Sequence, residues 1–124
     1  KPGMTNQVGH IIDVSATFRD VTGAKYPKEI LGKKTKPPLG KSLLPIFNGK
    51  QREPHKEIYW HFSRANAVRQ GDLKAVRAGK TWELYDLKAD PTETNNLAKE
   101  RPKKTAELAK MWEVWRQDYK NKPK

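Results

Sequence analysis

The three histidines are the first residues to consider for catalysis or metal binding. His10, His55 and His61 lie 45 and six residues apart. None forms the i, i+4 pair of a helical metal site. The chain contains no cysteine, and no serine lies in a nucleophile elbow. The spacing therefore predicts no metal site and gives a catalytic triad no positive support.

Asp86, Asp90 and Glu93 lie close together and could bind a cation. A structural role explains the same residues, because Asp90 can accept hydrogen bonds from the amides of a short helical turn that begins at Pro91. Glu93 can then reach back to the start of that turn, as in a capping box. We favour the capped turn over a cation site.

Charge and aromatic residues suggest a second class of function. The net charge is +12, and the excess of basic residues is +7 over residues 1–56 and +5 over residues 57–124. This balance fits either a polyanionic partner or a solvated cationic surface. A single-strand binder would stack bases on aromatic rings beside basic residues; the candidates are Trp60, Phe62, Trp82, Tyr85, Trp112 and Trp115 with Arg64, Arg69 and Lys74. Most of these rings fall on faces that a small domain must bury, so core packing is the favoured interpretation, and a small nucleic-acid- or polyanion-binding module stays the alternative.

The elements that position these residues follow from hydrophobic spacing. Ile11, Val14, Phe18 and Val21 recur at helical intervals before Gly23, which predicts one amphipathic helix. Residues 24–54 are rich in proline and glycine and predict a long irregular segment with "SLLPIF" as its apolar anchor. Short runs at 58–62, 65–70, 73–77 and 81–85 predict four strands of an antiparallel meander. A helix with one apolar stripe follows from Pro102 and should pack on the sheet.

The composition indicates that part of a core is missing. Only 35% of the 124 residues are hydrophobic, below the usual share for an independent domain. No apolar run approaches the ~20 residues that span a bilayer. The chain begins at a lysine inside what is predicted to be a loop, as a cut end would.

The order of several segments resembles the C-terminal end of the sulfatase family, particularly its arylsulfatase-like members. These segments are "GHIIDV" followed by Thr17, "GKSLLPIFNGK", "IYWHF", "NAVRQGDLKAV", and "WELYDLKADPTETNNLA" before a tryptophan-bearing helix. The resemblance covers nearly the whole chain, and the last segment is the most telling part.

The resemblance implies an α+β fold: a four-stranded antiparallel meander with a long C-terminal helix packed on it, preceded by one helix and a long loop from the end of an alkaline-phosphatase-like α/β domain. Residues 1–55 would be the C-terminal remnant of the catalytic domain, and residues 56–124 the small C-terminal subdomain. The fragment would be periplasmic or secreted in a bacterial parent.

The resemblance also implies that the chemistry lies elsewhere. Sulfatases hydrolyse a sulfate ester with a formylglycine, made from the cysteine of a C-x-P-x-R motif, and a bound calcium ion. That cysteine and its motif are absent from these 124 residues. We therefore assign no catalytic residue, expect the chain by itself to be inactive and without cofactor, and expect formylglycine and calcium in the parent, which would act on a sulfate ester.

Two further expectations concern partners. Relatives often follow the strand tryptophan with Glu and His, whereas here Trp60 precedes His61 and Phe62. This part of the subdomain can face the active-site rim, so His61 and Arg64 are the candidate substrate-binding residues. The first helix and the "SLLPIF" anchor would have lost their packing surface in a fragment, and we expect them to pair with another copy of the chain.

Overall fold

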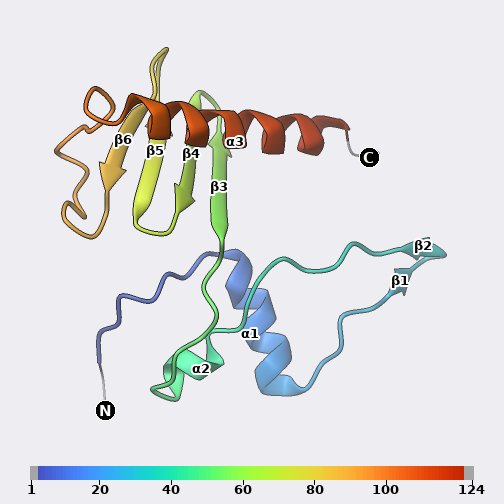
Figure 1. Cartoon of the computed structure of the whole chain (residues 1–124). Coiled ribbons are helices and arrows are strands. Elements are labelled where there is room, and N and C mark those ends of the chain that lie inside the picture. The colour runs from blue at the N-terminus through green and yellow to red at the C-terminus, as the bar shows by residue number, and fades with distance from the viewer. Residues whose placement is uncertain (1–2, 122–124) are drawn as a thin grey trace. The chain divides into compact units, whose positions relative to one another are not determined.

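The computed structural model describes residues 3–121 (Figure 1). It divides into two compact units: an N-terminal unit that ends at His55 and a C-terminal unit that begins at Lys56. Each unit is described by itself below. Which part of a larger protein each unit represents stays a prediction.

The C-terminal unit is a four-stranded antiparallel sheet covered by one helix. Its strands are β3 (Glu57–Phe62), β4 (Ala65–Gln70), β5 (Leu73–Arg77) and β6 (Glu83–Asp86), in that spatial order. The helix α3 (Pro102–Asn121) runs across one face of the sheet (Figure 1). The predicted meander and its helix are confirmed, although the last strand begins two residues later than expected.

One apolar row fixes α3 to the sheet. Val68, Ala75 and Leu84 lie directly opposite one another on β4, β5 and β6, and each is 0% exposed. Leu108 and Trp112 of α3 complete this buried cluster. Apolar burial stabilises by roughly 25 cal/mol per Å², so burial of this row stabilises the packing of α3 on the sheet.

Among the residues described, no helix is both long and apolar enough to cross a membrane.

Aromatic rings extend the packing to the edge strand. Tyr59 of β3 stacks on Trp115 with ring centroids 5.1 Å apart, and Trp115 stacks in turn on Tyr119. The indole Nε1 of Trp112 donates a hydrogen bond to the carbonyl oxygen of Trp60 at 2.9 Å. These contacts anchor β3, which has a neighbouring strand on one side only.

The corner after β6 is held by Asp90, as predicted, but without a capping box. The Asp90 carboxylate accepts hydrogen bonds from the backbone amides of Thr94 and Asn95, both at 2.8 Å. The bond from Asn95 contributes most to a lowered pKa of Asp90. Glu93 has a left-handed backbone (φ 59°) and its carboxylate lies 2.5 Å from the Lys74 ammonium, so the predicted return of Glu93 to the turn is wrong. The carboxylate of Glu93 forms a stronger hydrogen bond with the charged ammonium of Lys74 than it would with a neutral backbone amide. No helix begins at this turn.

The segment after that corner is tied back along β6. The side-chain oxygen of Asn96 accepts hydrogen bonds from the amides of Leu84 and Ala98, at 3.1 and 2.9 Å. The amide of Leu97 donates to the carbonyl oxygen of Leu84 at 2.8 Å. Leu97 is thereby drawn into the apolar cluster.

The N-terminal unit contains α1 (Ile12–Thr22), the two-residue strands β1 (Glu29–Ile30) and β2 (Lys33–Lys34), and the single helical turn α2 (Leu44–Phe47). Gly23 ends α1 with φ 69°, as its position predicts. At Gly40 the chain passes so close to α1 that a Cβ atom would lie 2.1 Å from the carbonyl oxygen of Ile12. The segment predicted as irregular is irregular apart from these short elements.

A buried carboxylate holds the N-terminal unit together. Asp13 is fully buried, and its Oδ1 accepts hydrogen bonds from the Lys41 amide and from His55 Nε2, both at 2.8 Å. Its Oδ2 accepts from the His10 amide at 2.9 Å and from Arg52 Nη2 at 3.0 Å. One side chain therefore joins the start of α1 to three segments of the loop that follows it. We call these five residues the Asp13 clamp.

The apolar surface of α1 is, in contrast, exposed. Ile11, Phe18 and Val21 have 76%, 67% and 61% of their surface accessible. Ala16 is the one buried apolar residue among the described residues of this unit. The predicted amphipathic stripe exists, but it faces outward while the polar clamp faces inward.

We expect Asp13→Asn to destabilise the N-terminal unit by about 3–5 kcal/mol, because loss of the carboxylate leaves Arg52 and His55 buried without their anion. Hydrogen exchange of the α1 amides measures this loss. Asp20→Asn is the control, since Asp20 is exposed on the same helix. Equal exchange rates in the two variants would contradict the role given to Asp13.

The clamp should also make stability depend on acid. Burial by itself raises the pKa of Asp13, but the hydrogen bonds from Lys41, His10, His55 and Arg52 together lower it from 3.8 to about 2. A lowered pKa in the folded state gives stability that is present above pH 3.8 and is lost as the pH falls toward 2. We expect the free energy of unfolding of the N-terminal unit to fall by roughly 2 kcal/mol between pH 5 and pH 2. Exchange of the α1 amides measures this fall, which should be smaller in Asp13→Asn.

Candidate functional site

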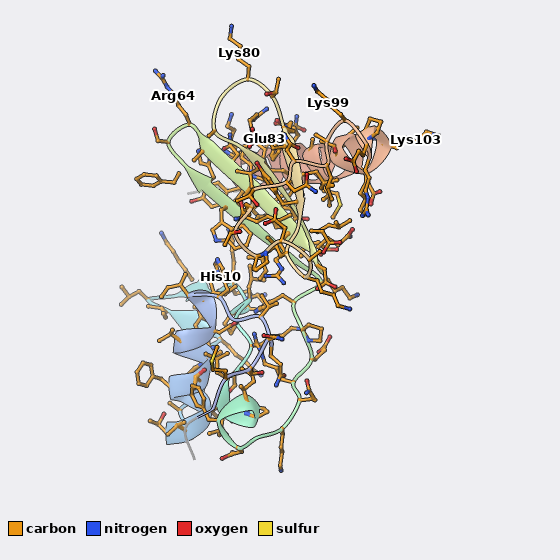
Figure 2. All side chains as sticks on the ribbon, turned by 90° about the vertical axis from the view of Figure 1, so that its left-hand side faces the viewer. His10, Arg64, Lys80, Glu83, Lys99 and Lys103 are labelled. Atoms are coloured by element: carbon orange, nitrogen blue, oxygen red, sulfur yellow. The ribbon has the colours of Figure 1, made fainter. Side chains whose placement is uncertain are left out.

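The predicted substrate-binding residues lie at one end of the β3–β4 hairpin. Phe62 pairs with Ala65, so Ser63 and Arg64 form a two-residue turn. Ser63 takes a left-handed conformation (φ 52°), which tight hairpin turns require and which is uncommon for a residue other than glycine. Phe62 is 82% exposed beside this turn. Figure 2 shows Arg64 at the turn, pointing away from the strands.

Asn66 connects the two candidate residues. It lies opposite His61 in the register of β3 and β4 and is only 7% exposed. Its Nδ2 donates a hydrogen bond to the Arg64 carbonyl oxygen at 3.2 Å, and its Oδ1 lies 2.8 Å from His61 Nδ1. Asn66 was not among the predicted site residues, and its only signal in the sequence was a polar residue at an inward-facing strand position.

A second arginine, on the neighbouring strand β5, is held by contacts within the domain. Arg77 pairs with Asn66 in the β4–β5 register, and its guanidinium lies 4.8 Å from the centre of the Trp82 ring. It also forms an ion pair with Glu113 of α3 at 3.2 Å. The guanidinium of Arg64, in contrast, extends from the turn into solvent (Figure 2). Of these two arginines, Arg64 is therefore the one whose side chain is exposed.

The acidic residues do not form a cation site. Asp86 accepts hydrogen bonds from the amides of Lys88 and Ala89, while Asp90 and Glu93 serve the corner and the ion pair described above. Between residues 3 and 121, no three histidine or acidic side chains gather in a way that could hold a metal ion. The donors of Asp13 saturate its two oxygens, which leaves no position for a metal there.

The aromatic residues are largely used in packing, as favoured above. Trp112 and Tyr85 are buried, and Trp82 and Trp115 pack against the apolar cluster. Phe62 alone of the six candidate rings is strongly exposed. Nothing found supports the nucleic-acid alternative.

Comparison of the sequence with known proteins gives a consistent result. Residues 1–120 match the family model described as N-sulphoglucosamine sulphohydrolase, C-terminal. The N-acetylglucosamine-6-O-sulfatase of Bacteroides thetaiotaomicron is 30% identical over 139 aligned residues, covering 98% of this chain and 24% of that protein. An uncharacterized sulfatase of Schizosaccharomyces pombe is 30% identical over 113 residues, covering 85% of this chain and 20% of that protein. The chain thus spans about a quarter or less of the length of these relatives.

Solved structures share the fold. A sulfatase in complex with its substrate D-glucosamine-2-N,6-O-disulfate superposes with a TM-score of 0.59 at 30% identity, over 90% of this chain and 24% of that one. A 2-O GAG sulfatase superposes with a TM-score of 0.61 at 28% identity, over 88% of this chain and 25% of that one. The expected fold class is confirmed by these neighbours.

Proposed function

We propose that the whole protein is a sulfuric ester hydrolase, since this chain belongs to the sulfatase family and is the C-terminal domain of a sulfatase. The match of residues 1–120 to the C-terminal family model carries this proposal. The reaction itself would be performed by residues outside these 124. The two units would then be the last helix and wrapping loop of the catalytic domain (residues 1–55) and the small C-terminal subdomain (residues 56–124).

The cofactors of the family do not fit the residues of this chain. A formylglycine forms from a cysteine or serine that is followed two residues later by proline and four residues later by arginine, and the chain has no such motif. A calcium ion requires several free oxygen ligands, whereas the buried carboxylate of Asp13 is fully engaged by protein donors. Both groups would be held by the catalytic part of the whole protein, and no step of the reaction is assigned to this domain.

A sulfated saccharide is the substrate class that we propose for the whole protein. Relatives include an N-acetylglucosamine-6-O-sulfatase and an ulvan-active sulfatase of Formosa agariphila. In this chain, His61 and Arg64 are proposed to contact that substrate at the rim of the active site. Arg64 suits this role because a guanidinium binds the oxygens of a sulfate in a bidentate manner, as it binds phosphate.

The exposed face of α1 gives this domain a docking surface. Ile11, Phe18 and Val21 line it, and contiguous exposed apolar residues mark interfaces. We propose that the catalytic part of the sulfatase covers this face in the whole protein. In the chain by itself, a second copy would cover it and give a homo-oligomer.

We expect this chain to replace the C-terminal quarter of the Bacteroides N-acetylglucosamine-6-O-sulfatase, because 98% of the chain aligns there. The chimera should release sulfate from N-acetylglucosamine 6-sulfate. An unrelated domain of the same length in that position is the control, and the chain by itself should hydrolyse no aryl sulfate. A chimera no more active than the control, or turnover by the chain alone, would contradict the proposal.

We expect light scattering of the isolated chain to show a mass that rises with concentration, because the α1 face is uncovered. Phe18→Asp should shift the population to monomer, since the charge prevents burial of that face. Asp20→Asn, also exposed on α1, should leave the oligomer unchanged. A strict monomer at high concentration would exclude self-association through α1.

A further inference from the structure

The buried amide of Asn66 has only one satisfactory orientation. Its Nδ2 faces the carbonyl oxygen of Arg64, which can only accept a hydrogen bond. The Oδ1 therefore faces His61, and an amide oxygen also only accepts. Reversing the amide could still satisfy its nitrogen at His61, but it would set two oxygens against each other at the Arg64 end, because the backbone carbonyl there can only accept.

This orientation determines the tautomer of His61. The hydrogen bond at 2.8 Å forms only if Nδ1 of His61 carries the proton. In the neutral imidazole, Nε2 is then the bare nitrogen. His61 is exposed, so this nitrogen is accessible to a ligand. The same ring packs at a tilt against Trp112, with centroids 5.8 Å apart, which limits its rotation.

Asn66 also acts on the backbone of Arg64. The Ser63 conformation is strained for a residue with a Cβ atom, and the turn needs support from outside itself. The hydrogen bond from Asn66 Nδ2 to the Arg64 carbonyl oxygen supplies it. A single buried amide thus fixes the tautomer of one residue and the backbone of the other.

We propose that Asn66 is a positioning residue that presents His61 Nε2 and the Arg64 guanidinium together as a two-point recognition site for a sulfated saccharide. The Nε2 atom accepts a hydrogen bond from a hydroxyl or N–H group of the sugar, and Arg64 pairs with the sulfate. The saccharide class rests on the proposed function, whereas the positioning by Asn66 does not.

Nuclear magnetic resonance of the chain with labelled histidine tests the positioning directly, at a pH where the imidazole is neutral. In the natural chain, the His61 nitrogen and Cδ2 shifts should report a proton on Nδ1. In Asn66→Ala, the shifts should move toward the Nε2-protonated form. Asn95→Ala is the control, because that exposed side chain makes none of these contacts.

Asn66→Asp separates the two roles and covers the case in which Asn66→Ala fails to fold. A carboxylate still accepts the Nδ1 proton but cannot donate to the Arg64 carbonyl oxygen, so His61 should keep its tautomer while the amide of Ala65, which pairs with Phe62 to close the turn, exchanges faster. If Asn66→Ala retains the Nδ1 proton, or if both variants give the same spectra, the positioning role is overturned.

Titration with glucosamine 6-sulfate, with glucosamine as the unsulfated comparison, tests the ligand. The His61 and Arg64 signals should saturate with the sulfated sugar alone, and Asn66→Ala should weaken binding about tenfold, as loss of one preorganising hydrogen bond does. Absence of any shift, or equal shifts with both sugars, overturns the saccharide site. An inactive chimera combined with the expected tautomer and binding would instead overturn only the proposed function.

Discussion

The register of the antiparallel sheet under α3 is the constraint on which the C-terminal unit depends. Because side chains alternate between the two faces, a slip of one residue would turn the whole row of Val68, Ala75 and Leu84 away from the helix. The same register places Asn66 opposite His61 and leaves only two residues for the turn that carries Arg64. The apolar core and the polar hairpin end are therefore consequences of one pairing.

The N-terminal unit is held in a different way. It lacks a row of buried apolar side chains among its described residues and relies on four donors gathered around Asp13. A buried ion pair contributes little net stability on its own but is costly to break, so it specifies one arrangement of the chain. The Asp13 clamp thus sets the path of the loop, while the apolar face of α1 remains exposed.

Local patterns in the sequence predicted the helices, the meander and the role of Asp90, because each depends on residues a few positions apart. The ion pair of Glu93 was not predictable in this way, because its partner Lys74 lies on β5, 19 residues earlier in the chain. The Asp13 clamp was missed for the same reason, since its partners lie 28 to 42 residues away apart from His10. The contacts of Asn66 were also not predictable, because they depend on a turn in which Ser63 adopts a conformation typical of glycine. The family resemblance came from the order of short segments and required no knowledge of these contacts.

The meander and the Asp13 clamp also differ in the length of chain that each contact must close. Consecutive strands of the meander are neighbours joined by short turns, so the sheet grows from local contacts and can form quickly. The carboxylate of Asp13 must instead capture His55 across 42 residues, which is a slow search with a larger entropic cost. The meander can therefore pair strand by strand across its short turns. The helix α3, which reaches back 52 residues from Trp112 to Trp60, and the Asp13 clamp both close long stretches of chain and would be completed later.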